Sequence, residues 1–259
     1  MTALRGNRLI VANWKMNGLR RDGLDRARTL VVRASATPPK GCEIVLCPPS
    51  TLLHEIRGAL DGSAVQLGAQ DCHQATHGAF TGDVSAAMLA DVGCRYVIVG
   101  HSERRAGHAE RDADVAAKAL AAVSAGLTPI ICVGERREER DSGQALTVIE
   151  AQVRASVPSS LTLPFVLAYE PIWAIGSGRT PTTAEIEAVH ALVWRVLNDH
   201  FSGTMPDVRV LYGGSVGAKN APELLAIRGV HGALVGGASL SVEDFWAICA
   251  AAGRLDVAA

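Results

Sequence analysis

The stretch FVLAYEPIWAIGSG, residues 165–178, indicates how this chain folds and where its chemistry lies. It begins with an apolar run that does not alternate with polar residues, which is typical of a parallel strand covered on both faces. The run ends in a carboxylate, Glu170, and an apolar segment with two glycines follows. An acid at the end of a buried strand raises the question whether other strands end in the same way.

Apolar runs of this kind occur eight times along the chain. The expected strands cover residues 9–12, 44–47, 65–69, 96–99, 129–133, 165–168, 208–211 and 233–235. Helices are expected over residues 24–34, 115–125 (with Lys118 exposed), 144–157 and 183–198, near Asn220 and Ser241, and at a solvated start in the charge run 135–141. The helix at 183 begins with the capping-box pattern Thr182 to Glu185.

Repeated strand–helix units predict an α/β fold with a parallel sheet. Eight units without a linker predict a single domain, residues 1–259, folded as a (β/α)8 barrel of eight parallel strands ringed by helices. The alternative is an open doubly wound sheet, which would carry a glycine-rich phosphate turn after its first strand. Here Asn13-Trp14-Lys15 follows the first run instead.

Composition argues against several classes of function. Lys and Arg number 25 against 26 Asp and Glu, so a net charge of −1 indicates neither a nucleic-acid partner nor binding to an anionic membrane. No run approaches the roughly 18 apolar residues of a membrane span, and the N-terminus lacks the apolar stretch of a signal peptide. The six cysteines show no metal-ligand spacing, so we expect reduced thiols in a cytoplasmic protein without a metal.

The carboxyl ends of the predicted strands collect polar residues, and in a (β/α)8 barrel these ends form the active-site face. Asn13 and Lys15 follow the first run, His101 the fourth and Glu170 the sixth. Taken singly, Lys15 reads as a surface cation, His101 as a structural histidine and Glu170 as the start of a loop. Their convergence on one mouth favours a catalytic site.

Glycines after the last two strands indicate the ligand. Gly213-Gly214-Ser215 follows the seventh run and Gly236-Gly237 follows the eighth. This is the frequent phosphate-binding position of such barrels, where backbone N–H groups bind the anion. With further N–H groups from Gly176-Ser177-Gly178, the sequence predicts a site for a phosphate dianion that uses few side-chain cations.

Longer motifs extend the argument over almost the whole chain. They are NWKMN at residues 13–17, GAFTGD at 78–83, VGHSERR at 99–105, ICVGE at 131–135, AYEPIWAIGSG at 168–178, YGGSV at 212–216 and LVGGASL at 234–240. In this order they resemble the triosephosphate isomerase family, for which YEPxWAIG together with GHSERR is highly specific. The resemblance implies a TIM barrel that interconverts dihydroxyacetone phosphate and D-glyceraldehyde 3-phosphate through an enediolate, without cofactor or metal.

The resemblance also implies catalytic roles. Glu170 resembles the general base, His101 the neutral electrophile that polarises the carbonyl, and Lys15 the fixed positive charge near the substrate. Asn13 would orient this site, and Glu103 would contact the catalytic residues without touching the substrate. A neutral His101 is also favoured physically, because it opens a helix whose positive end disfavours the imidazolium form.

The same resemblance assigns the substrate-binding groups. Asn13 and Lys15 would contact the substrate, and the phosphate cradle would consist of backbone groups of Gly176, Ser215, Gly236 and Gly237. The apolar residues 173–175 would form a lid that residues 176–178 allow to close, which excludes water from the enediolate.

The loop from Asp71 to Thr81 is long for a connection and carries little charge. The family inserts this loop into a second subunit, which implies a homodimer. Four positions depart from the commonest family pattern, and none of them removes a catalytic group: Asp83, Ile172, Ser177 and Arg179. Asp83 is one methylene shorter than the usual Glu, which affects its reach toward Arg104.

Parts of the sequence are compatible with three other functions. An isomerase of a four-carbon ketose (tetrulose) phosphate would use identical catalytic groups and differ only in pocket volume. A silent phosphate-binding barrel is disfavoured by the retained Lys, His and Glu. A hydrolase built on the GGSVG stretch at residues 213–217 is disfavoured because His231 precedes Asp244, whereas that fold needs the acid before the histidine.

Overall fold

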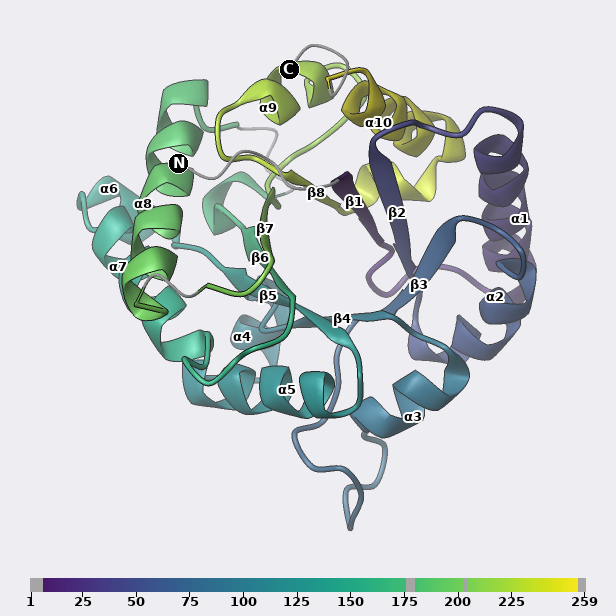
Figure 1. Ribbon diagram of the computed structural model, residues 1–259, viewed down its shortest axis with the longest axis horizontal. Coiled ribbons are helices and arrows are strands. Elements are labelled where there is room, and N and C mark those ends of the chain that lie inside the picture. Colours follow the sequence, from purple (N-terminus) through teal and green to yellow (C-terminus); the bar gives the residue numbers. More distant parts are fainter. Residues whose placement is uncertain (1–6, 176–179, 203–204, 256–259) are drawn as a thin grey trace.

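The computed structural model describes residues 7–175, 180–202 and 205–255 and shows a closed barrel of parallel strands (Figure 1). The strands are β1 (Arg8–Asn13), β2 (Cys42–Cys47), β3 (Val65–Ala69), β4 (Tyr96–Val99), β5 (Thr128–Val133), β6 (Phe165–Tyr169), β7 (Val208–Tyr212) and β8 (Gly232–Val235). They pair in chain order, and β8 closes the barrel by pairing with β1. The predicted barrel and its eight strands are confirmed.

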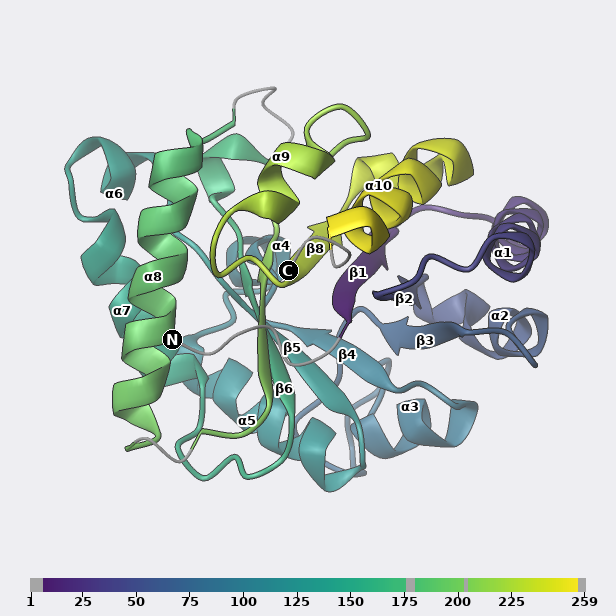
Figure 2. The same cartoon turned by 45° about the horizontal axis from the view of Figure 1, so that its top comes forward.

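Helices surround the barrel, as two views of the ribbon show (Figure 1; Figure 2). They are α1 (Arg20–Ala36), α2 (Leu53–Ala59), α3 (Ala86–Val92), α4 (Ser102–Gly107), α5 (Asp112–Ser124), α6 (Arg137–Asp141), α7 (Ala145–Ser156), α8 (Thr183–His200), α9 (Ala221–Ala226) and α10 (Val242–Leu255). The capping box predicted for α8 is confirmed, because Thr182 and Glu185 exchange side-chain and backbone hydrogen bonds. Helices α2 and α3 were not predicted, since seven residues are too few to show a helical period.

Apolar side chains form two layers, one inside the barrel and one between the strands and the helices. Alternate residues of each strand face opposite sides. In β1, Leu9 and Val11 belong to the inner layer, whereas Ile10 and Ala12 belong to the outer one. Both faces are therefore buried, which explains why the strand sequences are apolar without alternation. None of the described helices is long and apolar enough to cross a bilayer.

Lys118 corrects one prediction, because it is buried instead of exposed. Only 8% of the residue is accessible, and its ammonium group donates to Asp71 at 2.8 Å and to Glu110 at 2.6 Å. Neither carboxylate belongs to α5, so the sequence of this helix alone does not reveal that Lys118 has them as partners. The ion pair with Asp71 fastens the start of the long loop to the barrel.

The loop of residues 71–81 projects from the barrel (Figure 1), and most of its residues are exposed. Within it, the ring of Phe80 lies 4.0 Å from that of His73, centroid to centroid. Asp83 lies 3.8 Å from His73, whereas Arg104 forms ion pairs with Asp71 and Glu110. In the described chain, Arg104 thus has carboxylate partners other than Asp83.

Candidate active site

The carboxyl ends of five strands surround a cavity of about 460 Å³. Seven of the predicted site residues line it: Asn13, Lys15, His101, Glu170, Ser215, Gly236 and Gly237. Ile175, Val216 and Leu234 add apolar surface. Glu103 is not part of the lining but contacts Lys15. Gly176 lies outside the described residues. The structure thus brings the described candidates to one place, as the strand-end argument predicted.

Glu170 lies directly beyond β6, and its side chain is 3% exposed. Oε1 lies 2.9 Å from Nε2 of His101, and Oε2 accepts a hydrogen bond from the backbone N–H of Ser102 at 3.0 Å. Glycines directly after the two neighbouring strands, β5 and β7, make this position possible. A Cβ on Gly134 would lie 1.7 Å from the carbonyl oxygen of Glu170, and one on Gly213 would lie 2.9 Å from its Cγ.

Burial and pairing act in opposite directions on these two groups. For Glu170, burial raises the pKa, but the charge and hydrogen bond of His101 outweigh it, so the carboxyl's pKa is lowered from its ordinary value. For His101, burial lowers the pKa, and the Glu170 carboxylate outweighs it and raises the imidazole's pKa. Nδ1 of His101 accepts from the N–H of Glu103 at 3.2 Å, so in this geometry the neutral ring carries its proton on Nε2.

Lys15 has an unusual backbone conformation and contacts the side chains of three other residues. Its φ of 52° is unusual for a residue with a side chain. Asn13 Oδ1 accepts from its N–H at 3.0 Å, and its ammonium group lies 2.6 Å from Glu103. Gln70 donates to its carbonyl oxygen at 2.8 Å and to that of Cys47 at 3.0 Å. The sequence places Gln70 after the third strand, at the same end of the barrel as the predicted site residues, but assigns it no role.

Glu135 corrects the expectation of a solvated run over residues 135–141, because its side chain is fully buried. One of its oxygens, Oε1, lies within 3.2 Å of three donors: Trp173 Nε1 at 2.7 Å, Arg140 at 2.7 Å and the Tyr169 hydroxyl at 3.2 Å. Trp173 begins the predicted lid, so this buried carboxylate fixes the root of that segment. The predicted hinge residues 176–178 lie outside the described residues.

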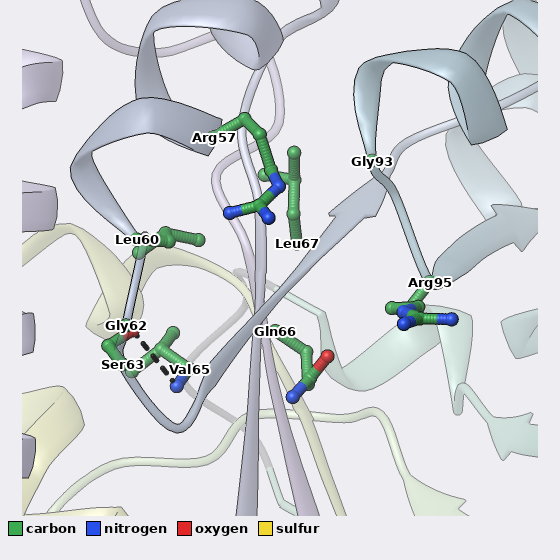
Figure 3. A pocket seen from close by; sticks show the side chains of 9 residues that line it. All are labelled: Arg57, Leu60, Gly62, Ser63, Val65, Gln66, Leu67, Gly93 and Arg95. Carbon is green, nitrogen blue, oxygen red and sulfur yellow. Dashed lines mark hydrogen bonds between the residues drawn. The ribbon is translucent and has the colours of Figure 1, made fainter.

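A smaller cavity of about 190 Å³ lies at the opposite end of the barrel, near the starts of β3 and β4 (Figure 3). Its lining includes Arg57, Gln66 and Arg95, and Arg57 donates to Asp61 at 2.7 Å. Among the described residues that line it there is no carboxylate and no histidine. In the parts of the chain that the structure describes, no three His, Cys, Asp or Glu side chains are grouped to hold a metal ion.

Comparison with known proteins agrees with this geometry. A family model described as triosephosphate isomerase matches residues 8–252. The triosephosphate isomerase of Acidiphilium cryptum is 50% identical over 256 residues, covering 95% of this chain and 98% of that protein, and that of Xanthobacter flavus is 50% identical over 254 residues, covering 98% and 100%. The crystal structure of the Bartonella henselae enzyme, 40% identical, matches with a TM-score of 0.85 over 95% of this chain and 98% of that chain. The chain therefore belongs to the triosephosphate isomerase family.

Proposed function

We propose that this chain interconverts dihydroxyacetone phosphate and D-glyceraldehyde 3-phosphate, and that the residues at the barrel mouth carry the proton transfers. The observation that carries the assignment of roles is the contact of a buried carboxylate with an imidazole, 2.9 Å apart, in a cavity that also contains Lys15. This activity belongs to glycolysis and gluconeogenesis, and its expected location is the cytoplasm.

Glu170 is the proposed base. A carboxylate shielded from water is more effective at taking a proton from carbon, because its lone pairs are not solvated. In the structure its two oxygens are held by His101 and by the N–H of Ser102. When the substrate enters, the carbon next to the carbonyl takes the place of His101 as the neighbour of Oε1. Glu170 removes the proton from that carbon and returns it to the adjacent one, while His101 gives the Nε2 proton to the former carbonyl oxygen and takes the proton of the neighbouring hydroxyl, whose oxygen becomes the new carbonyl.

His101 and Lys15 stabilise the oxygen atoms of the enediolate. The carboxylate contact raises the pKa of His101, so when substrate takes the place of that contact, burial favours the neutral ring. The Nε2–H of this neutral His101 donates to the substrate carbonyl, whose oxygen gains negative charge as the C–H bond breaks. The ammonium group of Lys15 supplies a fixed positive charge to the same region. Charge therefore develops next to groups that the fold has already oriented, with little reorganisation during the reaction.

Backbone groups of Ser215, Gly236 and Gly237 are the proposed phosphate site. Gly237 lines the cavity, and a Cβ there would meet no atom within 4 Å, so the space beside its Cα is open. A Cβ at Gly236 would lie 3.2 Å from Cε of Lys15, which would disturb the catalytic cation. Glycine at these positions lets an anion approach the backbone closely and leaves Lys15 its place. The N–H of Gly176 would complete the site.

Apolar residues 173–175 are the proposed lid. Ile175 lines the cavity together with Glu170 and Leu234, and Ala174 is fully buried. An apolar cover over the carboxylate lowers the local water content, which favours proton transfer and protects the enediolate from losing phosphate.

We further propose a homodimer through residues 71–81. Phe80 is 44% exposed on this loop, and Met16 is 95% exposed beside Lys15. Gln70, immediately before the loop, donates to the carbonyl oxygen of Lys15. This hydrogen bond connects the start of the loop to the residue that precedes Met16. Covering these apolar side chains with a second subunit would remove them from water and hold the Lys15 segment in place.

The proposal is tested by assaying the purified chain with triose and tetrulose phosphates. We expect fast turnover of the trioses and at least tenfold lower kcat/KM for the four-carbon ketose; the reverse order would assign the alternative isomerase. Glu170→Gln removes the base without changing its size and is expected to abolish most activity. Glu187→Gln makes the same change at an exposed position of α8 and is the matched control.

A further inference from the structure

Gly134, the residue after β5, has backbone groups that no strand satisfies. Successive residues of a strand direct their N–H and C=O groups to opposite neighbours. Val133 and Glu135 bond to the β6 side, because their carbonyl oxygens accept from Glu170 N at 2.8 Å and Ile172 N at 3.1 Å. Gly134 therefore faces the β4 side, where β4 has already ended at Val99.

The side chain of Gln152 takes the place of the missing strand. Its Oε1 accepts from the N–H of Gly134 at 2.8 Å, and its Nε2 donates to the carbonyl oxygen of the same residue at 3.1 Å. A primary amide is both a donor and an acceptor, so one side chain satisfies both groups. Only one orientation of the amide makes both bonds. The two contacts together fix the position and the tilt of the Gly134 residue.

The inward face of α7 presents this amide at a fixed place. Ile149 and Val153 on that face are fully buried against the barrel. Gln152 and Ser156 are its polar members, three and seven residues after Ile149, as helical spacing requires. Ser156 accepts from Arg105, which also donates to the carbonyl oxygen of Cys132 on the same edge of β5. Gln152 is thus one of two polar supports for this strand end.

Gly134 in turn lies directly against Glu170. The 1.7 Å between a Cβ on Gly134 and the carbonyl oxygen of Glu170 shows how closely the two backbones pack. The residues on either side of Gly134 bond to the backbone of Glu170 and of Ile172, and the second of these leads into the lid. A shift of Gly134 would therefore move the base and the root of the lid together.

We propose that Gln152 is a positioning residue, which fixes Gly134 and through it the carboxylate of Glu170 and the first turn of the lid. The inference rests on the proposed isomerase function. The phosphate-binding glycines follow β7 and β8, away from α7 and β5, so loss of the amide should alter the chemical step more than substrate binding. Misplacing a reacting group by about 1 Å can cost on the order of 100-fold in rate.

The first variant is Gln152→Met, which keeps the length of the side chain and removes both hydrogen bonds. We expect kcat to fall by about 10- to 100-fold, with KM within about twofold of the wild type. The matched control is Arg154→Met on the exposed face of the same helix, where the arginine pairs with Glu150, and its kcat should equal that of the wild type. Thermal unfolding of both variants reports any general loss of stability.

The second variant is Gln152→Glu, in which a change of pH alters the hydrogen bonds to Gly134 without a further substitution. An effect on the position of Gly134 can therefore be distinguished from a general loss of stability. The ionised carboxylate accepts from Gly134 N–H but repels its carbonyl oxygen, whereas the protonated carboxyl restores both bonds. The ratio of its kcat to that of the wild type should therefore rise as the pH falls from about 8 toward the carboxyl's pKa, which is ordinarily near 4.3. The same ratio for Gln152→Met should stay flat.

The positioning role would be overturned by a kcat of Gln152→Met within twofold of the wild type, or by a ratio for Gln152→Glu that does not change with pH. A fall in kcat that Arg154→Met shares, with equal loss of stability, would overturn it as well. Failure of the proposed function is distinguishable, because then the wild-type chain itself would not turn over triose phosphates.

Discussion

Glu170 and His101 are in direct contact in this structure, with Oε1 of the acid 2.9 Å from Nε2 of the ring. The proposed base and the proposed electrophile thus contact each other through the same atoms that would contact the substrate. Each also has a backbone donor, Ser102 N–H for the carboxylate and Glu103 N–H for Nδ1 of the ring. These donors belong to the start of α4, so one helix terminus orients both partners of the reaction.

Ile175→Ala should raise the share of turnovers that end in phosphate release. Ile175 lines the cavity beside Glu170, and a smaller side chain leaves the enediolate open to water. Isomerised product and inorganic phosphate are measured in the same reaction, with Leu146→Ala at an exposed position of α7 as control. If both products fall in equal proportion, Ile175 contributes to binding and not to protection of the intermediate.

Replacing residues 74–78 with a short polar turn should yield monomers with sharply reduced activity. The change shortens the exposed loop that carries Phe80, and the loop base is joined through Gln70 to the carbonyl of Lys15. Sedimentation gives the subunit state, and kcat is measured at the same concentration. A fully active monomer would show that neither the loop nor a second subunit supports Lys15.

Stability should fall below about pH 6.5 because of two buried histidines. Burial lowers the pKa of His190 to about 4, and burial with the charges of Arg8 and Arg209 lowers that of His231 to about 4. In the unfolded chain a histidine titrates near 6.5. Between about pH 4 and 6.5 the unfolded state binds more protons, so each histidine removes up to about 1.4 kcal/mol of stability per pH unit as the pH falls.

The measurement for the histidines is urea unfolding of the wild type and of His190→Gln across pH 4 to 8. The variant keeps a side chain that can donate to the carbonyl oxygen of Gly229, which Nδ1 of His190 contacts at 3.0 Å. Its free energy of unfolding should depend less steeply on pH in the acid range. Parallel curves for the two proteins would mean that His190 does not titrate as described.

Lys118→Met should destabilise the fold by about 3–5 kcal/mol, the usual cost of removing one partner from a buried ion pair. The substitution leaves the carboxylates of Asp71 and Glu110 with Arg104 as their remaining cation. Chemical unfolding measures the loss, and Lys219→Met at an exposed position is the control. Equal stability of the two variants would show that Arg104 alone compensates both acids.

The barrel could be predicted from the sequence because its signal is repeated. Each strand is buried on both faces, so a run such as residues 96–99 is apolar without interruption, and eight such runs leave few alternatives. Short helices gave no such signal, and α2 and α3 were therefore missed. The burial of Lys118 depends on Asp71, 47 residues away, a contact that no local pattern reveals.

The candidate site was predictable for side chains at strand ends and not for those that support them. Lys15, His101 and Glu170 follow strands directly, so the geometry of a barrel brings them together. Gln152 is a helical residue whose hydrogen bonds to Gly134 exist only once the helix has packed. Glu135 read as part of a charged surface run, and its burial follows from the donors that other segments bring to it.

The most direct test of the central claim is the kcat of Glu170→Asp for the triose phosphates, with substrate binding measured separately. The shorter side chain keeps the acid and retracts it by about 1 Å, and a displacement of this size costs on the order of 100-fold. We predict a loss of that order in kcat with binding little changed. A kcat within a few-fold of the wild type would contradict the assignment of Glu170 as the base.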